Sequence, residues 1–255
     1  MIDPRAIVDP RAELAEDVTV EAYAVIGPDV QIGAGTWIGP HAVVRGPTRI
    51  GSDNKIYQFA SVGEVPQDLK YQGEATELVI GDRNVIREFV TLNRGTVQDQ
   101  GRTQIGDDNL IMAYCHVAHD CVIGNRVIMS NGAQLAGHVR VDDAAILSGF
   151  TLVHQFSHIG SHAFTGMGSA VNRDVPPFVL VSGNYAEAYG INKEGLKRHG
   201  FSREEIAALH KAFKLVVKGR KLEQGLQEAE LLAREFPRVA QLVEFVKNSK
   251  RGIVR

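Results

Sequence analysis

The chain has 255 residues and is 44% hydrophobic, which is enough for a sizeable core in one large domain or two smaller ones. Lys+Arg number 28 and Asp+Glu 30, so the formal net charge of −2 gives no general electrostatic reason to bind nucleic acid or an anionic membrane. Two cysteines exclude a disulfide-dense scaffold. The first residues lack the charged and apolar pattern of a signal peptide, and no apolar run reaches membrane-spanning length, so we expect neither a signal peptide nor a spanning helix. These features predict a cytoplasmic protein without membrane insertion.

An aliphatic residue recurs at every sixth position through residues 8–62, 80–92 and 105–171. Of the 25 positions in this series, 23 are Ile, Leu or Val, and a glycine follows ten of the 25. A period of six fits neither a helix nor the plain alternation of a strand. It fits a short strand followed by a corner, where a small residue lets the chain turn. Three such sides make an 18-residue coil, so the sequence predicts a parallel β-solenoid with a core of stacked aliphatic side chains.

Two segments interrupt the period, and they are expected to leave the stack as surface loops at residues 64–79 and 94–104. The solenoid is expected to occupy residues 1–178. Residues 179–255 show helical periodicity instead, and Ser202 with Glu205 predicts a capping box at the start of one helix. This helical domain is expected to cover the open end of the solenoid. A DNA-reading helix-turn-helix is the alternative for these helices, but no basic recognition helix is visible.

Four histidines fall in the middle coils, at His116, His119, His138 and His154. With 18 residues per coil, Gly137 stacks on His119 and Gln155 stacks on Gly137, about 4.8 Å apart per step. His138 stacks on Asp120 in the neighbouring column. A histidine beside a carboxylate can act as a general base, and a glycine N–H at close approach can stabilise an oxyanion. The cluster therefore predicts acyl transfer to an alcohol.

Other interpretations of these residues remain. Polar residues at solenoid corners are often only solvated surface, and a zinc site is a further alternative. His116 and His119 are a weak ligand pair, because neighbouring residues of a strand point to opposite faces, so we expect no metal. Cys115 and Cys121 lie one hexapeptide apart and are expected to be small packing residues.

Six segments carry a resemblance to a known family: IYQFASVGE at 56–64, QDLKY at 67–71, HVAHDC at 116–121, LAGHV at 135–139, VHQF at 153–156 and GLKR at 195–198. They are similar to the UDP-N-acetylglucosamine acyltransferases, which begin lipid A synthesis, and the similarity continues into the helical tail. The resemblance implies a left-handed parallel β-helix, although the general rule for parallel crossovers favours right-handed coils. It also implies a homotrimer with active sites between subunits and no bound cofactor.

Carried over by position, the resemblance implies that His119 is the catalytic base, Asp120 its partner and Gly137 the oxyanion donor. Contacts to the sugar nucleotide or acyl thioester are implied for Asp68, Lys70, His116, His138, His154 and Gln155. Contacts to the nucleotide end are implied for Asn192, Glu194 and Arg198, the last suited to phosphate by its fork of donors.

Met167 stands where long-chain members of the family have glycine. A methionine at the end of an acyl groove would fill the volume of several methylenes, each worth about 0.8 kcal/mol of burial. We therefore expect Met167 to act as a ruler that favours an acyl chain near ten carbons over about fourteen, the alternative being that it is packing filler.

Together these features predict transfer of a 3-hydroxyacyl group of about ten carbons from acyl carrier protein to the 3-hydroxyl of UDP-N-acetylglucosamine. The alternatives are another hexapeptide acyltransferase that uses coenzyme A, or a non-catalytic β-helix scaffold. A basic surface around Arg173, Lys197 and Arg220 is the expected docking region for the acidic carrier protein.

Overall fold

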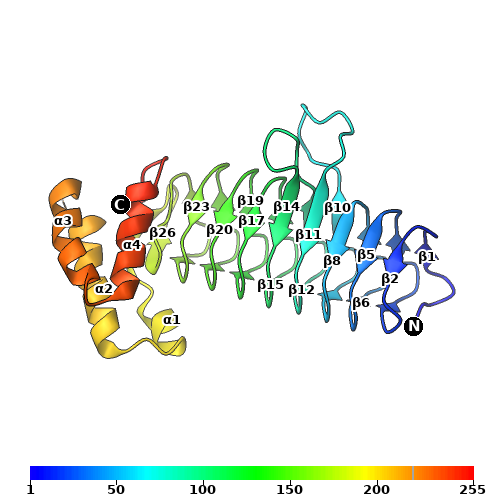
Figure 1. Cartoon of the computed structure of the whole chain (residues 1–255), viewed down its shortest axis with the longest axis horizontal. Coiled ribbons are helices and arrows are strands. Elements are labelled where there is room, and N and C mark those ends of the chain that lie inside the picture. The colour runs from blue at the N-terminus through cyan, green and yellow to red at the C-terminus, as the bar shows by residue number, and fades with distance from the viewer. Residues whose placement is uncertain (220) are drawn as a thin grey trace.

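The structure is a computed structural model that describes residues 1–219 and 221–255. Arg220, part of the expected basic surface, lies outside the described residues. Figure 1 shows a straight rod of stacked coils that starts at the N-terminus, with helices packed against its far end. The coils form a left-handed parallel β-helix with three sheets, one on each side of a triangular prism.

Each sheet takes every third strand of the chain. The first sheet holds β1 (Ile7–Val8), β4 (Val25–Ile26), β7 (Val43–Val44), β10 (Ser61–Glu64), β13 (Thr91–Asn93), β16 (His116–Val117), β19 (Gln134–Leu135), β22 (Leu152–Val153) and β25 (Ala170–Val171). The second sheet holds β2 (Glu13–Leu14), β5 (Val30–Ile32), β8 (Thr48–Ile50), β11 (Glu77–Ile80), β14 (Arg102–Ile105), β17 (Val122–Ile123), β20 (Arg140–Val141) and β23 (His158–Ile159). The third sheet holds β3 (Thr19–Val20), β6 (Trp37–Ile38), β9 (Lys55–Ile56), β12 (Val85–Ile86), β15 (Leu110–Ile111), β18 (Ile128–Met129), β21 (Ile146–Leu147), β24 (Phe164–Thr165), β26 (Val179–Ser182) and β27 (Glu187–Ile191).

The hexapeptide aliphatic residues form the core of the prism. Val117 pairs with Leu135 and Leu135 with Val153, a spacing of 18 residues, and all three are buried. The same column absorbs both interruptions, because Val62 pairs with Leu92 and Leu92 with Val117. The inserted segments therefore leave the prism as loops while the hexapeptide residues keep their pairing, and the register of β10 with β13 shifts only after Val62, where the first loop begins. Figure 1 shows both loops on one side of the rod.

Two kinds of residue allow the chain to turn at the corners: glycines, where a side chain would clash with the next coil, and larger residues with a positive φ. A Cβ at Gly33 would lie 2.7 Å from the carbonyl carbon of Gly51, so the hexapeptide glycines avoid a steric clash between coils. The left-handed backbone conformation falls elsewhere, for example at Phe59 (φ 62°) and Phe89 (φ 57°). Such rings stack on one another 4.9–5.3 Å apart, in an exposed column of Tyr23, His41, Phe59, Phe89 and Tyr114.

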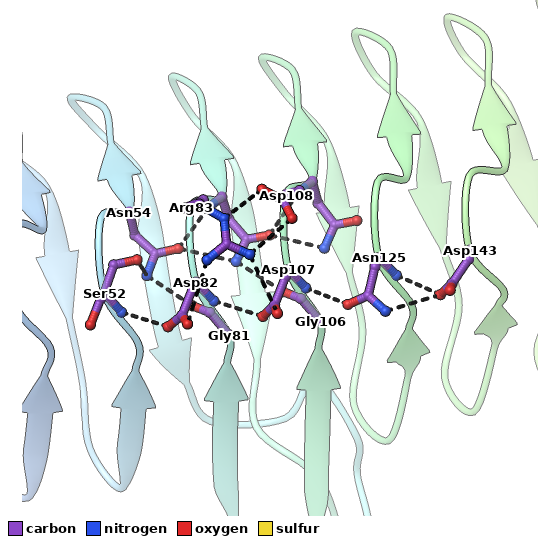
Figure 2. Close-up of polar contacts among 12 residues, drawn as sticks. Ser52, Asn54, Gly81, Asp82, Arg83, Gly106, Asp107, Asp108, Asn125 and Asp143 are labelled. Carbon is purple, nitrogen blue, oxygen red and sulfur yellow. Dashed lines mark hydrogen bonds and ion pairs between the residues drawn. The ribbon is translucent and has the colours of Figure 1, made fainter. Parts of the chain in front are cut away.

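A polar ladder connects the coils at the corner between the second and third sheets (Figure 2). It consists of Asp82, Asp107, Asn125 and Asp143. The backbone N–H of each of the first three donates to the side-chain Oδ1 of the next, at 2.8–2.9 Å. A Cβ at Gly81 would lie 2.1 Å from Oδ1 of Asp107, and Gly106 and Gly124 have the same relation to Asn125 and Asp143. The glycine before each of the first three ladder residues thus makes room for the side chain of the next coil.

The helices follow the last coil: α1 (Lys193–Arg198), α2 (Arg203–Val216), α3 (Leu222–Ala233) and α4 (Pro237–Asn248). The capping box predicted at Ser202 and Glu205 is confirmed. Strands β26 and β27 continue the third sheet beyond residue 178, so the first helix begins only at Lys193. At the end of α4, Ser249 Oγ donates to Asp174 Oδ2 at 2.7 Å, which fixes the helices over the last coil. Within the described chain, every helix is too short or too polar to cross a membrane.

Candidate active site

His119 and Asp120 lie in the turn between β16 and β17, at the corner between the first and second sheets. The two residues form a hydrogen-bonded pair, with His119 Nδ1 2.8 Å from Asp120 Oδ2. The side chain of Asp120 is 1% exposed and that of His119 15%. Because a carboxylate only accepts, Nδ1 carries the hydrogen and Nε2 keeps its lone pair. This is the tautomer that a general base requires.

The loop between β13 and β14 holds the Asp120 carboxylate. Thr96 donates its backbone N–H to Oδ1 at 2.8 Å and its hydroxyl to Oδ2 at 2.6 Å. Burial by itself raises the pKa of Asp120, but the hydrogen bonds from His119 and Thr96 outweigh it, so the pKa lies below its ordinary value. Asp120 is therefore an ionised partner that can stabilise a His119 imidazolium.

Gly137 lies against the ring of His119, as the 18-residue spacing predicts. A Cβ at this position would lie 2.7 Å from His119 Nε2. Its carbonyl accepts from Phe156 N at 3.1 Å, whereas its own N–H has no hydrogen-bond acceptor among residues 1–219 and 221–255. The backbone of Gly137, whose N–H is free, thus lies against the edge of the His119 ring that carries Nε2.

His138 completes the cluster from the next coil. Its ring meets that of His119 edge-on, with centroids 5.1 Å apart, and stacks on Phe156 at 4.4 Å. Nε2 is 3.9 Å from Asp120 Oδ2, and Nδ1 is hydrogen-bonded to Asp99 at 2.9 Å.

An apolar groove of about 480 Å³ runs along the outer face of the first sheet from this cluster towards the helical end. The outward residues of four successive strands form its floor: His116, Gln134, Leu152 and Ala170. Tyr185 and His154 also line it. Three coil spacings of about 4.8 Å make the floor roughly 14 Å long, a shape that accepts an extended aliphatic chain.

His116 lies where the groove meets the corner that carries His119 and Asp120. Its Nδ1 is 2.7 Å from the hydroxyl of Thr91. Burial, followed by the charge of His119, lowers its pKa, so this side chain is a neutral polar group at the mouth of the groove. His154 is exposed, and its Nδ1 lies 3.3 Å from Arg251 of the C-terminal segment.

The remaining predicted contacts lie outside this cluster in a single chain. Asp68 and Lys70 occupy the exposed loop between β10 and β11, where Asp68 Oδ1 accepts from the Lys70 backbone N–H. Gln155 is exposed at the catalytic corner, two coils beyond His119. Met167 is 77% exposed in the turn between β24 and β25, beside the groove strand β25 but not among the groove residues.

The residues predicted to contact the nucleotide lie at a different corner of the prism. Asn192 is 7% exposed and caps α1, accepting from Gly195 N and donating to the carbonyl of His162 at 3.1 Å. Glu194 and Arg198 are exposed on α1, where Glu194 pairs with Lys197 at 2.8 Å. Figure 1 shows α1 at the end of the rod, away from the inserted loops. Within one chain the fold does not bring these residues to His119.

Sequence reasoning missed the residues that hold the cluster in place: Thr96, Asp99 and Thr91. The first two lie in an inserted loop, where the six-residue register gives no position. Thr91 carried a usable signal, because it precedes the hexapeptide residue Leu92 as His116 precedes Val117. The two pair across the sheet and their side chains meet.

The same cluster has the spacing of a candidate metal site, since ligand atoms of His119, Asp120 and His138 lie within 4.8 Å of one another. An ion there would displace the hydrogen bond that orients His119, because Asp120 Oδ2 already accepts from both His119 and Thr96. The arrangement fits a proton-transfer pair better than a metal centre. Both cysteines are buried, and burial raises the pKa of Cys121 to about 12, as expected of inert packing residues.

The coil, the apolar groove and the His-Asp pair define a hexapeptide-repeat acyltransferase. The bacterial transferase hexapeptide family matches residues 29–64 and 102–137, and the Udp N-acetylglucosamine O-acyltransferase domain 2 family matches residues 174–254. The chain belongs to the UDP-N-acetylglucosamine O-acyltransferase family.

Its relatives match it from end to end. The acyl-[acyl-carrier-protein]–UDP-N-acetylglucosamine O-acyltransferase of Stutzerimonas stutzeri is 60% identical over 100% of this chain and 99% of its own. Among solved structures, the UDP-N-acetylglucosamine O-acyltransferase of Moraxella catarrhalis is 44% identical with a TM-score of 0.97, covering 100% of this chain and 99% of that one. The UDP-N-acetylglucosamine acyltransferase of Francisella novicida is 39% identical, also with a TM-score of 0.97, and the match covers 100% of this chain and 94% of that one.

Proposed function

We propose that this enzyme transfers a 3-hydroxyacyl group from acyl carrier protein to the 3-hydroxyl of UDP-N-acetylglucosamine, the first step of lipid A synthesis. The names of the relatives include both the acyl donor, acyl carrier protein, and the acceptor, UDP-N-acetylglucosamine. The observation in this chain that supports the proposal best is the His119–Asp120 pair beside the free N–H of Gly137, at the mouth of an apolar groove.

In the proposed mechanism, Nε2 of His119 takes the proton of the sugar 3-hydroxyl as its oxygen attacks the thioester carbonyl. The Asp120 carboxylate supports the imidazolium that forms, and the Gly137 N–H donates to the oxyanion of the tetrahedral intermediate. The C–S bond then breaks, and the imidazolium returns the proton to the leaving thiolate of the carrier. Protons balance within this cycle, so the residues of the chain suffice without a cofactor.

The acyl chain would extend along the groove of the first sheet. Leu152 and Ala170 give the groove floor an apolar surface. Met167 lies in the turn that precedes Ala170, where its side chain would limit the acyl chain to about ten carbons. Met167 does not line the groove of a single chain, so this limit requires a wall from another subunit.

A homotrimer would supply that wall. The predicted nucleotide residues on α1 lie at another corner from His119, and cyclic symmetry would bring α1 of one subunit to the groove of its neighbour. Two variants that the proposal predicts to be inactive, H119Q and R198A, test this when co-expressed. If the site is shared, mixed trimers contain some intact sites and regain activity. The mass of the assembly in solution should be three times the 27.8 kDa of one chain. Co-expressed protein as inactive as each variant alone would contradict the shared site.

The activity is tested with the purified protein, 3-hydroxydecanoyl acyl carrier protein and UDP-N-acetylglucosamine, with mass spectrometry of the product. We expect the 3-O-acylated sugar nucleotide, and a loss of about 10²–10⁴-fold in H119Q. H210Q, on α2, is the matched control and should retain wild-type turnover. Turnover only with the coenzyme A thioester would instead identify another hexapeptide acyltransferase, and absence of both turnover and sugar-nucleotide binding would identify a scaffold.

A further inference from the structure

The loop between β13 and β14 makes a second contact with the catalytic corner. Asp99, near the tip of this loop, places Oδ2 2.9 Å from Nδ1 of His138, a residue 39 positions later in the chain. The His138 side chain is 15% exposed, whereas that of Asp99 is 42% exposed. A half-exposed carboxylate thus holds a largely buried ring.

The loop is shaped to make this contact. Its backbone turns back on itself, with Gly101 N donating to Thr96 O at 3.1 Å and Gly101 in the left-handed region (φ 69°). Thr96 anchors the base of the turn to Asp120, and Asp99 reaches over to the next coil. A single loop therefore positions the carboxylate partner of one histidine and the ring of the other.

The contact determines which nitrogen of His138 is free. An ionised Asp99 only accepts, so Nδ1 carries a hydrogen. The stack on Phe156 fixes the ring plane, which leaves Nε2 on the side of His119 and Asp120. At 3.9 Å from Asp120 Oδ2, Nε2 makes no hydrogen bond with any described residue.

We propose that Asp99 is a positioning residue, which holds His138 with Nδ1–H bound to the carboxylate so that Nε2 faces the bound substrate beside His119. This inference rests on the proposed function. It assigns to the inserted loop a direct part in shaping the acyl-acceptor site, through the second histidine rather than through the base itself.

The kinetic test is a double-mutant cycle between residues 99 and 138. D99A is expected to lower kcat/KM for UDP-N-acetylglucosamine about tenfold, the loss of one hydrogen bond to a charged group. D99N keeps an acceptor oxygen and is expected to recover most of this loss. Q98A, on the same exposed loop, is the matched control and should match wild type. In an H138A background, D99A should cause no further decrease.

The second test measures the tautomer of the His138 ring directly. Nitrogen-15 NMR of protein labelled on histidine, with His138 assigned by its absence in H138A, should show Nδ1 protonated in wild type and a mixture of tautomers in D99A. An equal tenfold loss in the H138A background, or an unchanged His138 signal in D99A, would overturn the proposal. The NMR result does not depend on turnover, so it distinguishes failure of this inference from failure of the proposed reaction.

Discussion

The ring of His119 lies directly against the backbone of Gly137 in the next coil. A Cβ at residue 137 would lie 2.5 Å from Cε1 and 2.7 Å from Nε2 of that ring. The contact leaves no space for a side chain, and it brings the backbone of residue 137 against the edge of the ring that carries Nε2. The proposed base and the proposed oxyanion donor are thus positioned by the stacking of coils, without a flexible element between them.

G137A should therefore displace the His119 ring, because real Cβ contacts are not this short. We expect kcat to fall about 10²–10³-fold, because the added Cβ displaces the base from the backbone N–H that is the proposed oxyanion donor, with the thermal melting temperature little changed. G190A is the matched control, since a Cβ there meets nothing within 4 Å and turnover should be retained. Wild-type kcat in G137A would exclude this role.

Replacing Thr96 tests how strongly the inserted loop holds Asp120. T96V removes the hydroxyl that donates at 2.6 Å but keeps the backbone N–H donor and the side-chain shape. We expect a loss of about tenfold in kcat, because Asp120 loses one hydrogen bond to its ionised form. T96S restores the hydroxyl and should restore most of the activity. Equal losses in both variants would instead indicate a packing effect.

Chain-length preference is tested at Met167. M167G should shift the preferred acyl donor from about ten carbons towards about fourteen, because each added methylene gains about 0.8 kcal/mol when it is buried. The measurement is kcat/KM across a series of 3-hydroxyacyl carrier protein thioesters. An unchanged preference in M167G would show that Met167 does not limit the chain.

His162 should make stability depend on pH. Burial, followed by the charges of His199 and Arg238, lowers its pKa to about 4 from the ordinary 6.5. Between these values the unfolded chain binds a proton on this side chain and the folded protein does not, so stability is lost as the pH falls from 6.5 to 4.

H162F keeps an aromatic ring against Phe178 and Phe201 and removes this titration. Its melting temperature should therefore fall less than that of wild type between pH 6.5 and 4. H41F replaces an exposed histidine in the stacked corner column and should retain the wild-type dependence. Parallel curves for wild type and H162F would refute the assignment.

The coil architecture could be predicted because one rule repeats. Six residues per side place an aliphatic residue inside and a small one at the corner, and the same register stacks Gly137 on His119. The positive φ angles of the bulky corner residues could not be predicted, because bulky residues ordinarily avoid positive φ. Here Phe59 and Phe89 adopt it, with their rings stacked 5.1 Å apart.

Other parts of the site escaped prediction because they lie where the register does not apply. Thr96 and Asp99 belong to an inserted loop, whose path depends on local turns rather than on the period. The groove depends on the outward residues of the strands, such as Leu152 and Ala170, which the core pattern does not constrain. The position of α1 away from His119 follows from the whole chain path, which no local motif specifies.

The polar ladder gives the rod a direction of assembly. The corner N–H of Asp82 is satisfied by Asp107, and that of Asp107 by Asn125, so each of these N–H groups finds its acceptor in the coil that follows. A nascent chain that emerges N-terminus first therefore always ends in one unfinished coil, which the next segment to be synthesised closes.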